Sequence, residues 1–209
     1  EQNEKSILPE SFRVKEEIKI LINENYKLNE IEVNADALRG AGIWKSTNGG
    51  TSWSQLAGTN NSNFYYVQKV VVTTSGTVLA ATRNGLFRST NGGSTWTNVL
   101  SGIVADIEIG SNGNIYASTG IIQTAGNLYR STNDGSSFSD ITPATGGERM
   151  EIAVAPSDGN TLYVVASSGS NVAWFRKSTN GGSSWTTVAI PQYLEQSCSA
   201  GTQDFTRGQ

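Results

Sequence analysis

The stretch Ser89-Thr90-Asn91-Gly92-Gly93-Ser94-Thr95-Trp96 decides the fold, because the chain contains four closely similar copies of it. The other copies begin at Ser46, Ser131 and Ser178, so successive copies start 43, 42 and 47 residues apart. A repeat of this length is typical of stacked or radially arranged structural units. The sequence therefore predicts a repeat protein.

Each copy has the composition of a tight turn between two strands. Asn and Gly accept the positive φ that such a turn demands, and Ser and Asn side chains bond to nearby backbone groups. An aromatic residue ends each copy and is expected to anchor the hairpin. Four equivalent turns cannot all be one active site, so we interpret them as structural. The residues expected to build the turns are Ser46, Asn48, Gly50 and Trp53; Ser89, Asn91, Gly93 and Trp96; Ser131, Asn133, Gly135 and Phe138; and Ser178, Asn180, Gly182 and Trp185.

These copies resemble the Asp-box, or BNR repeat, whose pattern is Ser-x-Asp-x-Gly-x-Thr-Trp. They depart from it where the family usually has Asp and this chain has Asn. The resemblance covers residues 43–190. It implies that each box is the turn between the third and fourth strands of a β-propeller blade, remote from any active site. Asp-boxes occur in sialidases, xyloglucan hydrolases, sortilin-type receptors, photosystem assembly factors and secreted bacterial proteins, so the resemblance indicates a fold rather than a function.

The fold class expected is all-β, a β-propeller of four-stranded antiparallel blades. Strand-prone segments precede and follow the boxes, with turn residues at Gly76, 111–114 and 157–160. They predict three full blades and the outer half of another, with 191–209 unassigned. Propellers usually have four to eight blades, so we expect further blades of the same protein, or another chain, to complete the ring. The expected strands are 67–73, 77–82, 85–89 and 95–100; 104–110, 114–119, 127–131 and 137–141; 148–155, 161–167, 174–178 and 184–190; and 42–46 with 52–56.

A basic residue stands directly before each box, at Lys45, Arg88, Arg130 and Lys177. Because this position recurs in every blade, we interpret it as solvated or as pairing between blades. One step earlier the residue is aromatic in three blades but Arg176 in the last, which predicts a β-bulge nearby.

Residues 1–39 differ from the propeller region 40–209. They hold 6 basic and 9 acidic side chains, and apolar residues at helical spacing predict a short helix over about 10–24. The alternative is a strand, because Ile18-Lys19-Ile20-Leu21-Ile22 partly alternates. This segment is interpreted as a linker, a pro-segment or an edge cover of the propeller.

Composition excludes several functions. The net charge is -3, and residues 40–209 are neutral, which argues against a nucleic-acid partner. The chain contains no histidine, so catalysis and metal binding by histidine are excluded. Cys198 is the single cysteine and cannot form a disulfide or a metal cluster within this chain, although a cysteine outside it remains a possible partner. We expect no cofactor, no metal and no membrane span.

The connections opposite the boxes are the expected ligand-binding loops, because ligand sites lie on loops held by a rigid scaffold. Their candidate residues are Tyr65, Tyr66, Arg83 and Arg149. The innermost strands offer a second group at the channel mouth. The candidates for a glycosidase carboxylate pair there are Asp106, Glu108 and Glu151, although Lys69 nearby favours charge neutralisation.

Two functions remain open. One is a non-catalytic binding or scaffold propeller of a secreted, surface or periplasmic protein, which recognises a protein or a glycan. The alternative is a glycoside hydrolase of the xyloglucan-hydrolase type. A sialidase is disfavoured, because its Arg-Ile-Pro motif is absent and Ser11-Phe12-Arg13-Val14 does not match it.

Overall fold

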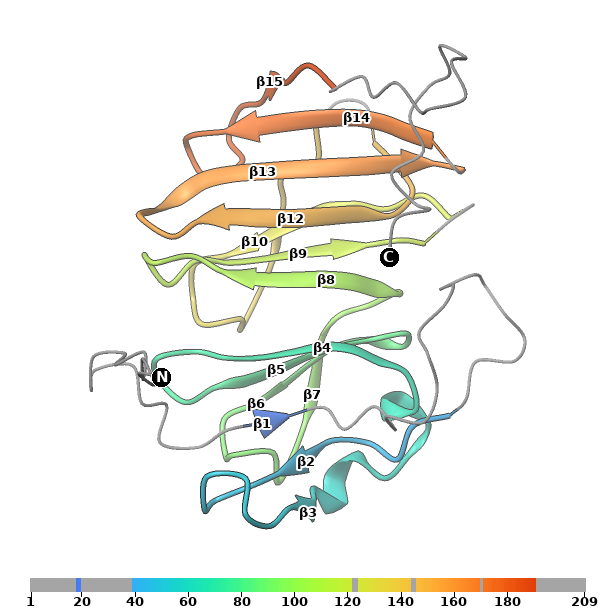
Figure 1. The fold of residues 1–209 in the computed structure, drawn as a ribbon, viewed down its shortest axis with the longest axis vertical. Helices are drawn as coiled ribbons and strands as arrows, with labels where there is room; N and C mark the ends of the chain where they lie inside the picture. Colours follow the sequence, from blue (N-terminus) through green and yellow to red (C-terminus); the bar gives the residue numbers. More distant parts are fainter. Residues whose placement is uncertain (1–17, 20–38, 122–123, 144–145, 170, 191–209) are drawn as a thin grey trace, which may run out of the picture.

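The computed structural model describes residues 18–19, 39–121, 124–143, 146–169 and 171–190. Their strands form four antiparallel sheets, one of three strands and three of four (Figure 1). Within each sheet, strands that follow one another in sequence are neighbours. Successive four-stranded sheets of this kind are the blades of a β-propeller, and we number them blade 1 to blade 4 along the chain.

The strand bounds are as follows. Blade 1 contains β1 (Ile18–Lys19), β2 (Trp44–Lys45) and β3 (Ser54–Gln55), and blade 2 contains β4 (Val67–Val72), β5 (Val78–Thr82), β6 (Gly85–Ser89) and β7 (Thr97–Leu100). Blade 3 contains β8 (Val104–Ile109), β9 (Ile115–Thr119), β10 (Leu128–Ser131) and β11 (Ser139–Asp140). Blade 4 contains β12 (Met150–Ala155), β13 (Asp158–Ser168), β14 (Asn171–Ser178) and β15 (Thr186–Thr187). Two short 3-10 turns, η2 (Ala57–Thr59) and η3 (Ser62–Phe64), connect blades 1 and 2.

The expected blades are confirmed, and each box connects the last two strands of its blade. The predicted bulge is present in blade 4, where Ala173 of β14 is an extra residue between the pairs Ala166–Trp174 and Ser167–Val172. The turn predicted at 157–160 is misplaced. Because Ala155 pairs with Asp158, the turn consists of Pro156 and Ser157, and Gly159 belongs to β13.

The N-terminal segment is a strand where the structure describes it. Ile18 pairs with Lys45 and Lys19 pairs with Trp44, so the helix expected over 10–24 is wrong at these two positions. The reason is that the edge of β2 offers unpaired backbone groups, which an extended segment satisfies and a helix cannot. The other positions of that helix, the tail 191–209 and Cys198 lie outside the described residues.

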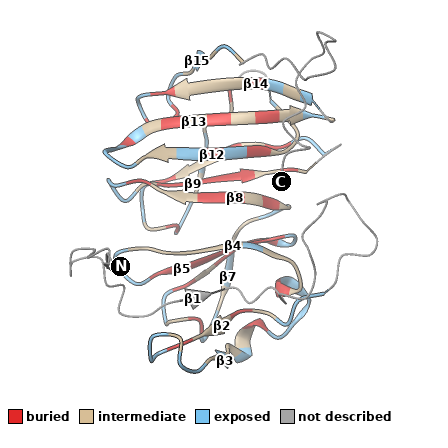
Figure 2. Ribbon diagram, in the orientation of Figure 1, coloured by how far each residue is buried: buried red, intermediate tan, exposed pale blue. Residues whose placement is uncertain are grey.

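The apolar core lies between the blades. Figure 2 shows buried residues on strands of all three complete blades. Three clusters are formed, each by side chains of two successive blades. The cluster between blades 1 and 2 contains Ile43, Phe64, Ala80 and Phe87. The next contains Leu79, Ala81, Leu86, Val104, Ile107, Ile115 and Ala117, and the last contains Tyr116, Leu128, Met150, Ile152, Leu162, Val164, Ala166 and Trp174.

The four boxes share one hydrogen-bond pattern, which the copy at Ser89 illustrates. The Ser89 hydroxyl accepts from the backbone N–H of Gly93 at 2.9 Å and donates to Asn91 Oδ1 at 3.0 Å. Asn91 Oδ1 also accepts from the backbone N–H of Thr95 at 2.9 Å. Ser89 is only 1% exposed. The serine and the asparagine therefore close the turn from inside, and the serine satisfies the buried N–H of Gly93.

Asparagine in place of the family's aspartate changes the last bond of the turn. In each box the amide Nδ2 donates to the hydroxyl four residues later at 2.8 Å, as Asn48 does to Ser52 and Asn180 to Ser184. An aspartate has no donor there, so the hydroxyl would have to reverse its role. The asparagine boxes are thus complete without a charge.

The third box departs from the others at Asp134, which has a positive φ of 58°. Its carboxylate accepts from Ser75 and Thr77 in the β4–β5 turn of blade 2 and pairs with Arg88 at 3.2 Å. Burial raises the pKa of Asp134, but hydrogen bonds from Thr77, Thr73 and Ser75, with the charge of Arg88, outweigh burial and hold the pKa below its usual value. The strained residue is therefore kept in place by blade 2.

Replacing the box serine tests the turn. Ser89→Ala leaves the buried N–H of Gly93 without its acceptor, so the free energy of unfolding should fall by about 2 kcal/mol in urea denaturation. The exposed Thr90→Ala in the same box is the control and should change it by less than about 0.5 kcal/mol. Equal effects of the two substitutions would contradict the assigned role of the serine.

The pH dependence of stability tests Asp134. Because its folded pKa is depressed, its contribution is present above the unfolded pKa of 3.8 and is lost as pH falls through the folded pKa. The stability difference between the parent chain and Asp134→Asn should therefore shrink below about pH 4, as measured by urea denaturation across pH. Asp134→Gly, which restores the residue of the other boxes, should lose the same pH dependence. A constant difference down to low pH would argue against the linkage.

Candidate functional site

The boxes and the first hairpin turn of each complete blade lie on the same face. The carboxylate of Asp134 in box 3 accepts from the β4–β5 turn, and Gly181 N–H in box 4 donates to the carbonyl of Asn160 at the start of β13. The opposite face therefore carries the connections between blades, where the expected ligand-binding residues are found.

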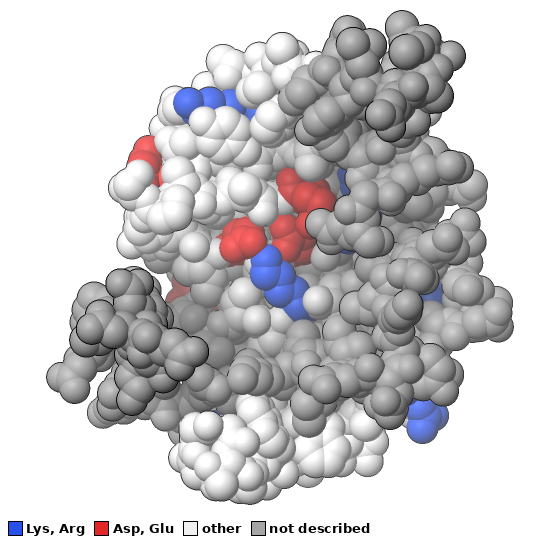
Figure 3. Space-filling view, viewed as in Figure 1, with Lys and Arg blue, Asp and Glu red and all other residues white. Residues whose placement is uncertain are grey.

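A group of charged side chains occupies the first strands of blades 2 to 4. Figure 3 shows acidic and basic side chains gathered near the middle of the face seen in Figure 1. Lys69 of β4 reaches two carboxylates of β8, with Nζ 3.0 Å from Asp106 Oδ1 and 2.5 Å from Glu108 Oε1. Burial lowers the pKa of Lys69, but hydrogen bonds to Glu108 and Asp106 outweigh it, so the pKa lies above its usual value. The pairing stabilises the ammonium ion and joins blade 2 to blade 3.

Asp106 is the buried member of this group, and its residue is 5% exposed. Its Oδ1 accepts from Lys69 and from the N–H of Ile107 at 2.8 Å, and its Oδ2 accepts from the N–H of Ile152 at 3.0 Å. Ile152 lies on β12, so one carboxylate connects the inner strands of three successive blades. This arrangement gives Asp106 a structural task, since both oxygens are already hydrogen-bonded within the protein.

Glu151 is exposed and pairs with Arg149, whose Nη2 lies 2.6 Å from Glu151 Oε1. Arg149 Nε donates to the same oxygen at 2.8 Å. The candidate carboxylates therefore divide into two groups: Asp106 and Glu108 pair with Lys69, and Glu151 pairs with Arg149. Each carboxylate among them has a basic partner.

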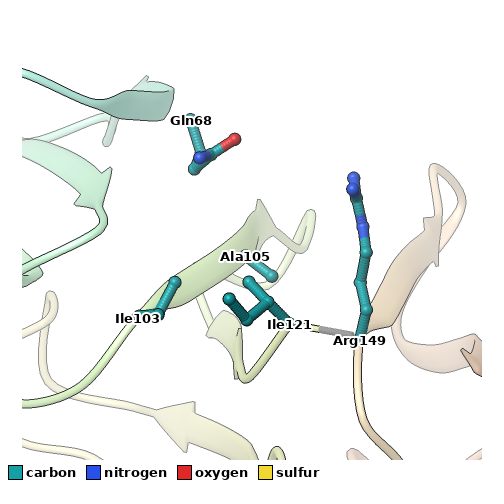
Figure 4. Close-up of a pocket in the computed structure, with 5 residues that line it drawn as sticks. All are labelled: Gln68, Ile103, Ala105, Ile121 and Arg149. Carbon is teal, nitrogen blue, oxygen red and sulfur yellow. The ribbon is translucent and has the colours of Figure 1, made fainter. Parts of the chain in front are cut away.

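A small pocket opens beside Arg149. Gln68 and Arg149 lie on two sides of it, and three apolar side chains of blade 3 lie between them (Figure 4). Those side chains belong to Ile103, Ala105 and Ile121. A pocket with an apolar floor and few polar groups is a usual form of ligand site.

Two tyrosines form a second group, each with an arginine over its ring. The guanidinium carbon of Arg39 lies 4.2 Å from the ring centroid of Tyr65, and that of Arg83 lies 5.6 Å from the ring of Tyr66. Backbone bonds fix the group, since Gly40 N–H donates to Tyr65 and Arg83 N–H to Tyr66. Both tyrosines are half-buried and both arginines are exposed, so this tyrosine–arginine group presents aromatic and cationic surface together.

The sequence pointed to Tyr65, Tyr66, Arg83 and Arg149 but not to Arg39 or Gln68. Neither missed residue belongs to a motif, and Gln68 is identified only once the bulge at the start of β4 is known. Among the described residues, no group of three metal-ligating side chains occurs. The same part of the chain holds no helix long and apolar enough to cross a membrane.

Removing the buried carboxylate tests its structural task. Asp106→Ala leaves the N–H of Ile152 without its carboxylate acceptor and leaves Lys69 with Glu108 as its remaining carboxylate partner. The free energy of unfolding should therefore fall by about 3 kcal/mol. The exposed Glu151→Gln is the matched control and should cost less than about 1 kcal/mol. Denaturant titration of both variants measures the difference, and an unchanged stability of Asp106→Ala would refute the structural role.

No family model and no curated protein sequence matches this chain. Solved structures of GH74 enzymes are similar to it. The GH74 enzyme of Niastella koreensis is 25% identical with a TM-score of 0.59, and the match covers 70% of this chain and 26% of that enzyme. An ancestral GH74 enzyme is 30% identical with a TM-score of 0.60, over 72% of this chain and 22% of the enzyme.

The GH74 xyloglucanase from Xanthomonas campestris is 21% identical, with a TM-score of 0.59 over 76% of this chain and 28% of the enzyme. This likeness concerns the fold alone. The chain spans between 22% and 28% of the length of these three enzymes. Together with the four sheets and their interblade cores, the comparisons show that the chain is an all-β, partial β-propeller.

Proposed function

We propose that this chain is part of an Asp-box propeller that binds a polysaccharide, without hydrolysing it, through the face opposite the boxes. The observation that supports it most directly is the tyrosine–arginine group at Tyr65 and Tyr66 on that face. Sugar rings present apolar C–H faces that pack on tyrosine, while their hydroxyls take hydrogen bonds from arginine. The pocket at Arg149 supplies a second contact point on the same face.

The four boxes support the Asp-box assignment. Their serine–asparagine bonds recur at every copy, between the last two strands of each blade. Asp-box propellers, including the sortilin type, are often secreted or exposed on the cell surface, and we propose such a location here. A polysaccharide ligand fits it, and two similar enzymes at 25% and 30% identity belong to GH74.

The central carboxylates favour binding over hydrolysis. A glycosidase needs two carboxyl groups on either side of the scissile bond, one of them able to deliver a proton. Asp106 is buried and hydrogen-bonded through both oxygens, Glu108 is paired with Lys69, and Glu151 is paired with Arg149. The alternative, a GH74-type hydrolase, is favoured by the structural likeness and requires that this pairing opens when substrate binds.

Calorimetry with soluble xyloglucan tests the proposal. The parent chain should bind, and Tyr65→Ala or Tyr66→Ala should each weaken binding about tenfold, through loss of roughly 1.4 kcal/mol of stacking. Tyr129→Ala, a half-buried tyrosine within β10, is the matched control and should bind as the parent does. Full binding by both loop variants would refute the proposed surface.

Release of reducing sugar separates the two functions. Incubation of the chain with xyloglucan should release none above a blank. If sugar is released by the parent chain but not by Asp106→Asn or Glu151→Gln, and circular dichroism shows that the variants are folded, the protein is a hydrolase and the binding proposal fails. If xyloglucan is neither bound nor cleaved, the polysaccharide ligand is rejected and a protein ligand takes its place.

A further inference from the structure

A basic side chain of blades 1, 2 and 3 reaches the box of the following blade. Arg88 Nε donates to the carbonyl of Asp134 in box 3 at 2.8 Å, and Arg130 Nη1 donates to the carbonyl of Gly181 in box 4 at 2.8 Å. Both acceptors are the fourth residue of their box. In the equivalent position of box 2, a Cβ placed on Gly92 would lie 3.3 Å from Lys45 Nζ. The residues before boxes 1, 2 and 3 therefore each reach the turn of the next box in the ring.

An apolar side chain covers the following glycine at two of these junctions. Leu56, after box 1, lies against Gly93 of box 2, and Ile141, after box 3, lies against Gly182 of box 4. Gly93 and Gly182 are buried as a result. A covered box thus has a cation on one side of the turn and an aliphatic side chain on the other.

Box 1 lacks this cover among the described residues. A Cβ placed on Gly49 would meet nothing within 4 Å, and one on Gly50 would meet only Trp53 of the same box. Gly49 is exposed, whereas its counterpart Gly181 in box 4 is buried. Among the described residues, the turn of box 1 thus lacks the basic and aliphatic side chains that lie against boxes 2 and 4.

Blade 4 presents the complementary half. Cross-strand pairing places Tyr163 beside Lys177 and Val165 beside Phe175 on one face of the sheet. The counterparts Leu79, Ala81 and Leu86 in blade 2 pair in the same register and are 0% exposed against blade 3. In blade 4 the three apolar residues are only half-buried.

Lys177 occupies the position that Arg88 and Arg130 occupy in their blades, but it contacts its own blade, with Nζ 5.3 Å from the ring centroid of Tyr163. The chain thus has a donor end at blade 4 and an acceptor end at blade 1. Lys177 and the turn of box 1 correspond to the donor and the acceptor of the junctions that Arg88 and Arg130 form inside the molecule.

We propose that two copies of this chain close head to tail, with blade 4 of each docking on blade 1 of the other. In that ring, Lys177 donates to the turn of box 1 in the second copy, and Tyr163, Val165 and Phe175 pack against its first sheet. The four described sheets of each copy make eight in the ring, which is within the usual range for propellers. A contact between unlike surfaces ends in a closed ring when the rotation closes. The proposal does not depend on the ligand that the opposite face binds.

Light scattering after size exclusion is the first test, because one chain has a mass of 22.3 kDa. A species of twice that mass is expected. Val165→Asp places a charge in the docking face and should give a monomer, whereas Thr97→Asp on the exposed side of blade 2 should leave the dimer intact. A monomeric parent chain, or a dimer that survives Val165→Asp, overturns the proposal.

A second pair of variants keeps the test valid if Val165→Asp fails to fold. Lys177→Ala removes one charged donor from each of two identical contacts, so the dissociation constant should rise roughly ten- to a hundredfold in sedimentation equilibrium. Lys45→Ala removes the same residue type from the equivalent position at an internal junction. It should lower the stability to urea and leave the dissociation constant unchanged. Equal dissociation constants for the two variants would place the contact elsewhere and overturn the proposal.

Discussion

The blades of this chain have two apolar faces, and a single sheet cannot bury both. Leu79 and Ala80 show the constraint, since they are consecutive residues of β5 and therefore point to opposite sides of the sheet. Both are 0% exposed, Leu79 in the cluster with blade 3 and Ala80 in the cluster with blade 1. Leaving either face in water costs about 25 cal/mol for each Å² of apolar surface. A blade is stable because it has a neighbour on each side.

Polar contacts set the distance and angle at which these faces meet. The boxes make rigid turns whose carbonyls accept from the preceding blade, as Gly181 does from Arg130. At the other end of the strands, Asp106 bonds to Lys69 of one neighbour and to the N–H of Ile152 of the other. Apolar packing alone does not fix a register, whereas these directional bonds do. The loops of the face opposite the boxes are held in place by the same bonds, because they begin and end on these strands.

The blades were predictable because the residues that determine each of them lie close together in the sequence. Asn-Gly turns, an aromatic residue and alternating strands recur within about 45 residues, so each copy reinforces the others. The turn of blade 4 was misplaced because Pro156 and Ser157 suffice for a tight turn, a choice that pairing between strands decides. The strand at Ile18 was not favoured because its apolar residues fit helix and strand periods alike, and only the open edge of β2 selects one.

The candidate site was less predictable, because its contacts join residues distant in the chain. The structural role of Asp106 depends on its hydrogen bond with the N–H of Ile152, which lies 46 residues later and on a different blade. The pairing of Tyr65 with Arg39 likewise depends on how two connections meet. The composition of the loops indicated that the face opposite the boxes carries the ligand site. The pairing of strands then determines which of its side chains bond within the protein and which face solvent.

The central claim is that the face opposite the boxes binds the ligand, while the carboxylates of Asp106 and Glu108 hold the blades together. A crystal structure of the protein with a xyloglucan oligosaccharide tests this most directly. The account predicts sugar density over the rings of Tyr65 and Tyr66, with Asp106 still bonded to Lys69 and Ile152. Density for a sugar between the carboxylates of Asp106 and Glu151, with those bonds broken, would contradict it.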